Sequence, residues 1–150
     1  MSRMSRILLT GATGYIGSHT WLALQEAGFE VVGLDNHANS SPKVLERLQS
    51  ISGQAPTFVK ADVTNRSELQ SVFSRFNIDA VVHFAAFKAV GESTQEPLRY
   101  YRNNVEGLLT LCEVMQQASC RHFIFSSSAT VYGQPKSLPI REDAPVQATN

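Results

Sequence analysis

The chain has 150 residues, the size of one ordinary domain. Hydrophobic residues make up 43% and charged residues 17%, so the composition supports a packed core and excludes a disordered segment. Acidic and basic residues balance to a formal net charge of zero, which gives no basis for long-range attraction to nucleic acid or to an anionic membrane.

The first predicted elements are a strand, a helix and a second strand. Residues 7–10 form an apolar run typical of a buried strand, and this run ends at Gly11. Residues 15–27 carry apolar side chains at helical spacing, and Gly28 is a suitable C-terminal stop. Residues 31–34 predict the second strand.

Two helices that flank a third strand are expected next. Ser41 and Pro42 indicate a helix start, with Ser41 as the cap and Pro42 at the first helical position. Residues 57–59 predict the third strand, and Asn65 followed by Glu68 has the spacing of a capping box. The apolar stripe expected on the first of these helices consists of Val44, Leu45, Leu48 and Ile51.

The remaining pattern predicts two strands, one long helix and a terminal loop. The strands are expected at residues 80–84 and 123–125, and the long helix between them at residues 98–118. After Ser126 the periodicity stops, and residues 133–150 are expected to form a loop because they contain three prolines and no period.

These elements together predict the fold class. Strands that are apolar throughout are typical of a parallel sheet covered by helices on both faces. Alternation of strands and helices at this spacing indicates βαβ units with right-handed crossovers. We therefore predict an α/β fold with a doubly wound parallel sheet. Because a fold rarely ends in a long loop, residues 1–150 are expected to be one incomplete domain whose carboxyl-terminal part is absent.

Cysteine usage and the start of the chain bear on location. Cys112 and Cys120 match no zinc or redox spacing and are too few for a disulfide framework. Residues 1–6 are basic, but the apolar run that follows is too short for a signal peptide or a membrane span. We expect a soluble, reduced, cytoplasmic protein.

A glycine motif follows the first strand and opens the first helix. Gly11, Gly14 and Gly17 form a GxxGxxG run inside a βαβ unit. Glycine permits the sharp turn, the approach of a pyrophosphate to the backbone, and close packing of helix and strand. The free N–H groups at the helix start would then face the anion. This pattern predicts a dinucleotide site; the alternative is a tight turn without a ligand.

Two aspartates follow the second and third strands. Asp35 lies 18 positions after Gly17, where a carboxylate accepts hydrogen bonds from the adenosine ribose and disfavours a 2′-phosphate. NAD is therefore favoured over NADP, with a turn or capping aspartate as the alternative. Asp62 is expected at the same sheet edge, where it either contacts the adenine or favours the start of the helix near Asn65.

Longer stretches point to a family. They are GATGYIGSHT at residues 11–20, DN at 35–36, HFAAFKAVGES at 83–93, PLRYY at 97–101, NNV at 103–105 and FIFSSSATVYG at 123–133. With these motifs the chain resembles the UDP-glucose 4-epimerase family of the extended short-chain dehydrogenase/reductase superfamily over nearly its whole length. Ala86 stands where members of this family often carry glycine.

The resemblance implies an NAD-binding Rossmann fold and a role for each matching residue. The pyrophosphate would be lined by Tyr15 and Ile16, the adenine would lie by Asp62 and Val63, and Ser128 would be the catalytic-site serine. The adenosine ribose would be held by Asp35, Asn36, His37, Ala38, Asn39 and Ser40. The rest of the cofactor would lie along Phe84, Ala85, Ala86, Phe87 and Lys88, with Asn103 contributing from the long helix.

Some of these roles have simpler alternatives in the residues themselves. Lys88 is also compatible with a solvated surface lysine, and Asn103 with an ordinary amide on a helix surface. The pattern alone does not choose among Ser126, Ser127 and Ser128, since hydroxyl residues are common at strand ends. The four histidines, His19, His37, His83 and His122, show no metal-ligand spacing and are expected to be structural or surface groups.

The activity that the resemblance implies is the interconversion of UDP-galactose and UDP-glucose by transient hydride transfer to bound NAD. In the family the general base is the tyrosine of a Tyr-x-x-x-Lys helix, which is expected just beyond Asn150. Tyr132 is not expected to be this tyrosine, because it lies in a strand-to-loop motif and Pro135 precedes Lys136. The 150 residues alone are therefore expected to be inactive.

Other functions are weighed against this one. A nucleotide-sugar 4,6-dehydratase or decarboxylase of the same superfamily is disfavoured; the dehydratases place acids beside the catalytic-site hydroxyl, and no acid stands at residues 128–130. An epimerase for another UDP-hexose and an NAD-binding module without catalysis both stay open.

The long helix carries two apolar stripes, so one is expected to cover the sheet and the other to contact a dimer partner or the absent half. One stripe is Leu98, Tyr101, Val105, Leu108, Leu109, Cys112 and Met115; the other is Tyr100, Asn104, Gly107, Leu111, Val114 and Ala118.

Overall fold

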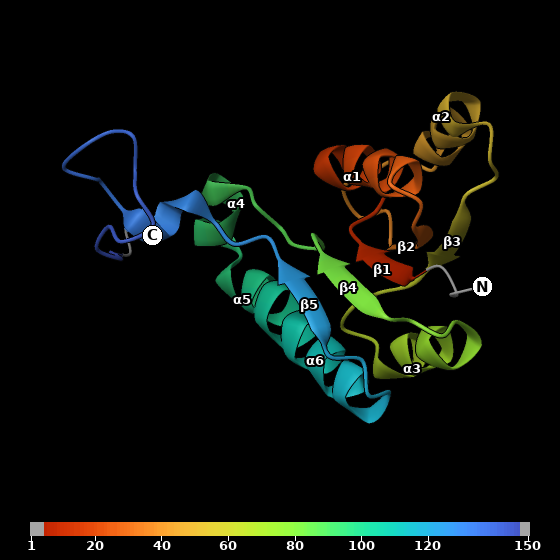
Figure 1. Cartoon of the computed structure of the whole chain (residues 1–150). Coiled ribbons are helices and arrows are strands. Elements are labelled where there is room, and N and C mark those ends of the chain that lie inside the picture. Colours follow the sequence, from red (N-terminus) through yellow and green to blue (C-terminus); the bar gives the residue numbers. More distant parts are fainter. Residues whose placement is uncertain (1–4, 148–150) are drawn as a thin grey trace.

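The computed structural model describes residues 5–147 of the chain. Five parallel strands form one sheet at its centre (Figure 1). The order across the sheet is β3-β2-β1-β4-β5, and neighbouring strands pair in parallel register throughout. This confirms the predicted α/β fold with a doubly wound parallel sheet, the Rossmann-like arrangement. The strands are β1 (Arg6–Thr10), β2 (Glu30–Asp35), β3 (Thr57–Lys60), β4 (Ala80–His83) and β5 (His122–Phe125).

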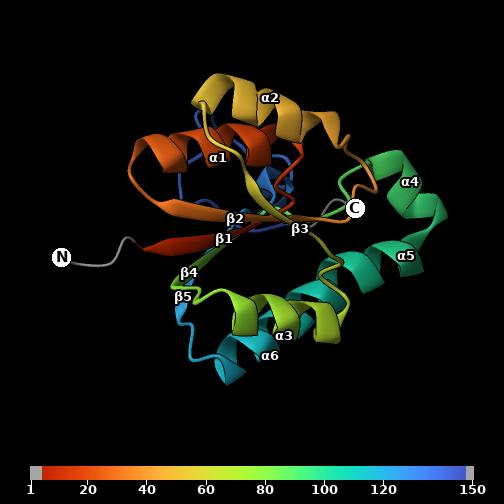
Figure 2. The same ribbon diagram turned by 90° about the vertical axis from the view of Figure 1, so that its right-hand side faces the viewer.

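Helices cover both faces of this sheet. One face carries α1 (Tyr15–Glu26) and α2 (Lys43–Ser52), and the opposite face carries α3 (Arg66–Arg75) and α6 (Gly107–Gln117) (Figure 2). Because each connection between parallel strands crosses over one face, the carboxyl ends of the strands are left open at one edge, where ligands of such sheets bind.

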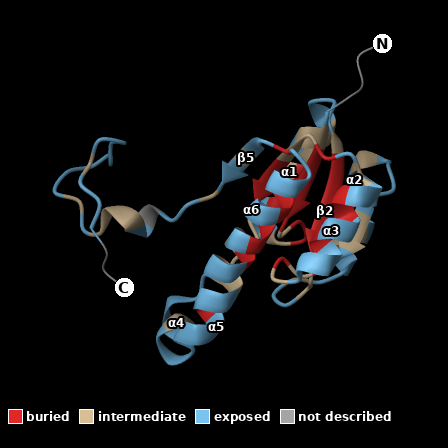
Figure 3. Cartoon of the chain, turned by 90° about the horizontal axis from the view of Figure 1, so that it is seen from below, coloured by how far each residue is buried: buried red, intermediate tan, exposed pale blue. Residues whose placement is uncertain are grey.

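The core consists of two clusters, one on each face, with the central strands buried between them (Figure 3). Successive residues of a strand point to opposite faces, so Leu8 packs with Leu69 and Leu111, whereas Leu9 packs in the cluster of Trp21. The edge strands β3 and β5 are less buried than the three central ones.

The expected capping box at the start of α3 is half present. The Asn65 side chain accepts a hydrogen bond of 3.3 Å from the Glu68 amide, as predicted. The Glu68 carboxylate, however, accepts from the Asp62 amide at 2.7 Å. The helix start is therefore tied to the end of the preceding strand, which positions residues 61–63 at the sheet edge.

The prediction for α2 was wrong in two details. The helix begins at Lys43, so Pro42 is the N-cap and the Ser41 hydroxyl accepts from the Lys43 amide over 3.3 Å. Ile51 was expected in the buried stripe but is 70% exposed in the last turn of α2, whereas Leu48, one turn earlier, is buried.

The long helix predicted for residues 98–118 is divided. It consists of α5 (Pro97–Tyr101), a π-helical turn η1 (Arg102–Glu106) and α6, and it follows a short helix α4 (Val90–Gln95) that the periodicity did not indicate. The stripe with Leu111 and Val114 covers the sheet, whereas most of the other stripe, including Tyr101 and Leu109, faces solvent. Met115 was predicted in the same stripe as Tyr101 and Leu109 but is buried.

Beyond β5 the chain leaves the sheet and projects to one side (Figures 1 and 3). It contains one turn of 3-10 helix, η2 (Ala129–Tyr132), and residues 133–147 have no regular element, as predicted. Residues 1–4 of the basic start and residues 148–150 of the predicted loop lie outside the described residues. Among residues 5–147, no helix has the length and apolar character required to cross a membrane.

Candidate functional site

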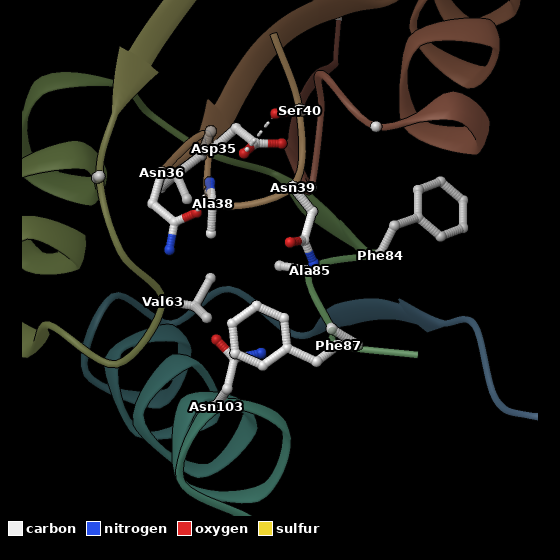
Figure 4. Close-up of a pocket in the computed structure, with 15 residues that line it drawn as sticks. Asp35, Asn36, Ala38, Asn39, Ser40, Val63, Phe84, Ala85, Phe87 and Asn103 are labelled. Carbon is white, nitrogen blue, oxygen red and sulfur yellow. Dashed lines mark hydrogen bonds between the residues drawn. The ribbon is translucent and has the colours of Figure 1, made fainter. Parts of the chain in front are cut away.

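A crevice opens at the carboxyl ends of β1, β2 and β4, between the glycine loop and the chain that follows β4 (Figure 4). It lies at the edge where ligands of open α/β sheets bind. The residues that line it are Gly11, Gly14, Leu34, Asp35, Asn36, Ala38, Asn39, Ser40, Ala61, Val63, Phe84, Ala85, Ala86, Phe87 and Asn103.

The glycine loop leaves space and free amides at one end of this crevice. A Cβ atom at Gly17 would lie 2.1 Å from the Gly11 carbonyl oxygen, so no side chain fits there. Gly11 has a φ of +67°, which only glycine adopts without strain. Gly14 is the N-cap of α1 and has no side chain to cap the first-turn N–H groups. The loop therefore presents backbone donors to an anion, as the motif predicted.

Asp35 organises the adjacent wall. Its carboxylate is largely buried, and Oδ2 accepts a hydrogen bond of 3.1 Å from the Thr13 amide. Oδ1 accepts from the His37 amide at 2.8 Å and from the Ser40 hydroxyl at 3.2 Å. The carboxylate thus joins the glycine loop to the loop after β2, and it still lines the crevice.

His37 supports this loop and does not line the crevice. Its backbone is left-handed, with a φ of +61°. Its ring packs against Phe58 at 5.1 Å between centroids, and Nδ1 lies 3.2 Å from the Thr13 hydroxyl. The His37 side chain holds the shape of the loop, and its backbone lies within residues 35–40, which the resemblance assigns to the ribose.

The sequence left open whether Asp62 contacts the adenine or favours the start of the helix near Asn65. Its carboxylate accepts from Asn36 Nδ2 at 2.8 Å and from the amide and hydroxyl of Thr64. Burial acts to raise the pKa of Asp62, but these hydrogen bonds outweigh it and the pKa is lowered. The side chain does not line the crevice, whereas its neighbours Ala61 and Val63 do.

The opposite wall is the chain from Phe84 to Phe87, and one side chain secures its far end. Asn104 accepts a hydrogen bond from the Phe87 amide at 2.8 Å and donates one to the Phe87 carbonyl at 2.9 Å. Asn103, beside it in the π-helical turn, lines the crevice. The wider turn of a π-helix is frequent at functional sites. Asn103 was predicted from the resemblance, whereas no role at this site was predicted for Asn104, although the adjacent pair of amides was a visible signal.

The Phe87 ring is held from the α5 side. The Arg99 guanidinium lies 4.6 Å from the ring centroid, and the Tyr100 ring packs at 5.5 Å. The Tyr100 hydroxyl donates to Glu92 at 2.7 Å, which lowers the pKa of Glu92 and raises that of Tyr100. Helices α4 and α5 are thereby fastened to each other behind the wall.

Several residues named from the resemblance lie beside the crevice or away from it. Tyr15 and Ile16 are exposed on the first turn of α1, next to the loop. Lys88 is exposed just past the wall. Ser128 is exposed on the projecting segment, where its hydroxyl lies 2.7 Å from the Thr130 hydroxyl.

Two lining residues, Leu34 and Ala61, were not named from the sequence. Each stands directly before an aspartate that was named, so their position at the strand ends was the available signal.

Tyr132 is the last residue of η2, and Gly133 follows with a φ of +59°. Lys136 is not helical, so this pair does not share a helix face. Among the described residues, no group of three His, Cys, Asp or Glu side chains is placed to hold a metal ion.

Comparison with known proteins places this site in context. Residues 7–150 match the sequence model of the "NAD dependent epimerase/dehydratase family". The UDP-glucose 4-epimerase of Bacillus subtilis (strain 168) is 51% identical over 144 residues, covering 96% of this chain and 42% of the relative.

Solved structures agree with the sequence relatives. The UDP-glucose 4-epimerase of Bifidobacterium longum, in complex with NAD+ and UDP, superposes with a TM-score of 0.92 at 45% identity, covering 95% of this chain and 43% of that one. The UDP-Glc/GlcNAc 4-epimerase of Campylobacter jejuni superposes with a TM-score of 0.88 at 38% identity, covering 96% and 43%. This chain therefore spans less than half the length of the proteins that it matches.

Proposed function

This chain belongs to the NAD dependent epimerase/dehydratase family, and we propose that its crevice binds NAD. The observation that carries the proposal is the junction of the glycine loop with Asp35. Backbone donors for a diphosphate and a carboxylate for ribose hydroxyls lie on two loops that Thr13 joins, through its amide to Asp35 and through its hydroxyl to His37 and Ser40. A Cβ at Gly17 would meet the Gly11 carbonyl oxygen at 2.1 Å, so glycine is needed there for the first turn of α1 to pack against the glycine loop.

We assign a part of the cofactor to each wall of the crevice. The first turn of α1, with Tyr15 and Ile16, would contact the diphosphate beside Gly11, Gly14 and Gly17. Residues 35–40 would surround the adenosine ribose, and Asp62 and Val63 would hold the adenine side, Asp62 through its bond to Asn36. The other half would lie along residues 84–88 and Asn103.

The coenzyme selectivity follows from charge. Asp35 accepts three hydrogen bonds within the protein and lines the crevice, where its remaining acceptor site suits a hydroxyl of an adenosine ribose. A 2′-phosphate at this position would meet a carboxylate of like charge. The site is therefore assigned to NAD and not to NADP.

For the protein that carries this chain, we propose UDP-glucose 4-epimerase activity, the interconversion of UDP-galactose and UDP-glucose. When bound, NAD supplies a hydride acceptor and donor for the C4 carbon of the sugar. Lys88 would add positive charge near the nicotinamide half, and Ser128 would donate a hydrogen bond to the reacting oxygen. The relatives in two comparisons bear this activity in their names, which supports the proposal.

A second substrate is favoured by one specific finding. The solved relative from Campylobacter jejuni is named for both UDP-Glc and UDP-GlcNAc. A UDP-N-acetylhexosamine is therefore the alternative substrate, and an assay with both sugar nucleotides decides between them. Binding of NAD without conversion of either sugar nucleotide would support an NAD-binding module without catalysis.

We also propose that the protein forms a homodimer through one face of α5 and α6. Leu98 is 72% exposed, and Tyr101 and Leu109 are also exposed along the same side of these helices. Apolar side chains aligned along a helix and not covered by the sheet are suited to packing against helices of a second copy.

The cofactor proposal is tested by calorimetric titration of the protein with NAD and with NADP. We expect saturable binding of NAD, and NADP binding at least about tenfold weaker because of the like charge at Asp35. Equal affinity for both coenzymes would contradict the ribose assignment, and no binding of either would contradict the site itself. Conversion of UDP-galactose, followed by chromatography, then tests the activity.

A further inference from the structure

A buried histidine lies under the crevice, and its role is separate from that of the glycine motif. His83 is the last residue of β4 and is only 2% exposed. Its Nδ1 lies 2.7 Å from Oγ1 of Thr10, the last residue of β1. On its other side, the rings of Phe123 and Phe125 from β5 pack against the imidazole. The His83 side chain therefore connects the carboxyl ends of β1, β4 and β5.

The Thr10 hydroxyl has a second partner, which occupies one of its two acceptor sites. The Ala85 amide donates to Thr10 Oγ1 over 3.3 Å. An amide can only donate, so the hydroxyl accepts there and its own hydrogen is free for Nδ1. For the hydroxyl to donate, Nδ1 must carry no proton. With the hydroxyl as donor, its partner is the neutral imidazole that carries the proton on Nε2, which is the tautomer expected here.

The surroundings of the ring keep it neutral. Burial is the main cause, with the positive charge of Lys88 next, and together they lower the pKa of His83 to about 4. The groups from β1 and β5 that face the ring, Thr10, Phe123 and Phe125, carry no charge.

The Ala85 amide is held at a place that sets the width of the crevice. The Phe84 amide also donates to the Thr10 carbonyl, at 3.1 Å. A Cβ on Gly11 would lie 2.7 Å from the Ala85 nitrogen, so the two chains are in direct contact. A small movement of Ala85 would therefore shift the wall of residues 84–87 relative to the glycine loop.

We propose that His83 is a positioning residue of the cofactor crevice. Its imidazole orients the Thr10 hydroxyl, this hydroxyl holds the Ala85 amide, and the Ala85 amide seats the wall of residues 84–87 against Gly11. The inference rests on the proposed NAD site, since NAD is the ligand whose affinity would report the position of the wall.

The first test compares two substitutions of His83. Asparagine places an oxygen acceptor near the position of Nδ1, whereas leucine places a methyl group there. We expect His83→Leu to weaken NAD binding by about tenfold, and His83→Asn to stay within about threefold of the parent protein. Thr10→Ser and Thr10→Val are the matched pair on the other side of the bond, with the same expected order. Equal NAD affinity in His83→Leu and the parent, or no rescue by asparagine, would overturn the proposal.

The second test uses the unsubstituted protein, so it does not depend on the folding of a variant. Imidazole 15N spectra at pH 7 should show His83 as the neutral form with the proton on Nε2. A proton on Nδ1 would overturn the proposal. Amide exchange at Ala85 should also accelerate in Thr10→Val and stay slow in Thr10→Ser. If the parent protein binds no NAD while both of these readouts hold, the cofactor assignment fails and the hydrogen-bond arrangement stands.

Discussion

The Thr13 amide donates a hydrogen bond to Asp35 Oδ2 at 3.1 Å, which ties the glycine loop to the carboxyl end of β2. The two residues are 22 positions apart and come from different loops. Because Oδ1 accepts two further bonds, from the His37 amide and the Ser40 hydroxyl, one carboxylate holds together the glycine loop and the loop after β2. Ligand recognition and loop structure therefore depend on the same side chain.

Replacing Asp35 by asparagine should disturb both functions. Each carboxylate oxygen accepts from a donor, so an amide nitrogen at either position sets donor against donor. We expect the free energy of unfolding to fall by about 1.5–3 kcal/mol and NAD affinity to fall by about tenfold or more. Urea unfolding and calorimetric titration measure these. Asp143→Asn, at a surface position, is the control and should change neither. Wild-type stability in Asp35→Asn would contradict this reading of the carboxylate.

Gly107 should tolerate no side chain. A Cβ there would lie 2.9 Å from Val63 Cγ2, and Val63 lines the crevice. Gly107→Ala is expected to lower the free energy of unfolding by about 1–3 kcal/mol through overpacking. Gly91 lies in α4 with open space around its Cβ position, so Gly91→Ala should be neutral or stabilise by about 0.5–1 kcal/mol. Thermal unfolding of both variants compares them, and similar melting temperatures would refute the close approach of α6 to Val63.

Asn104 should be required for the order of the crevice wall. Asn104→Ala leaves both the amide and the carbonyl of Phe87 without their side-chain partner. We expect a loss of about 1–3 kcal/mol in stability and faster amide exchange at Phe87. Asn103→Ala removes the donor to Asn104 Oδ1 at 2.9 Å but keeps both bonds to Phe87, so it should accelerate that exchange much less. An unchanged exchange rate of the Phe87 amide in Asn104→Ala would show that the two Asn104–Phe87 hydrogen bonds do not form in solution.

The proposed dimer can be tested with one charge. Leu109 is 58% exposed on α6, so Leu109→Lys should leave the monomer stable and shift the protein to monomers in sedimentation equilibrium. Ile51, on α2 at the far side of the sheet, is 70% exposed and provides the control. Ile51→Lys should leave the oligomeric state unchanged. A dimer that survives Leu109→Lys would place the interface elsewhere.

Acid should destabilise the protein through His83. The folded pKa of about 4 lies below the ordinary value of 6.5, so the unfolded chain binds the proton first as pH falls. The stability is complete above pH 6.5 and is lost as the pH falls towards 4, by about 3 kcal/mol in total. Urea unfolding between pH 7 and pH 4.5 measures this slope. His83→Asn, which does not titrate, should show a flatter dependence, and an unchanged slope would assign the acid sensitivity to other groups.

Local chemistry determined much of this protein from sequence alone. Apolar runs predict the strands, and apolar residues at helical spacing predict most helices. The reason is that an element that buries one face needs apolar residues at its own period, whatever the tertiary arrangement. The glycine run and Asp35 were predictable for the same reason: turns and sharp loops have residue requirements that are read within a few positions.

Only the tertiary structure decided which side chains meet. The pairs Thr13 with Asp35, Thr10 with His83, and Asn104 with Phe87 join segments that are 17 to 73 residues apart, and no local period encodes them. The same holds for Ile51, which follows the helical stripe but is exposed in the last turn of α2, and for His37, whose backbone is left-handed and whose ring packs against Phe58. Sequence patterns specify which face of an element is apolar, whereas strand order and crossover packing specify what that face contacts.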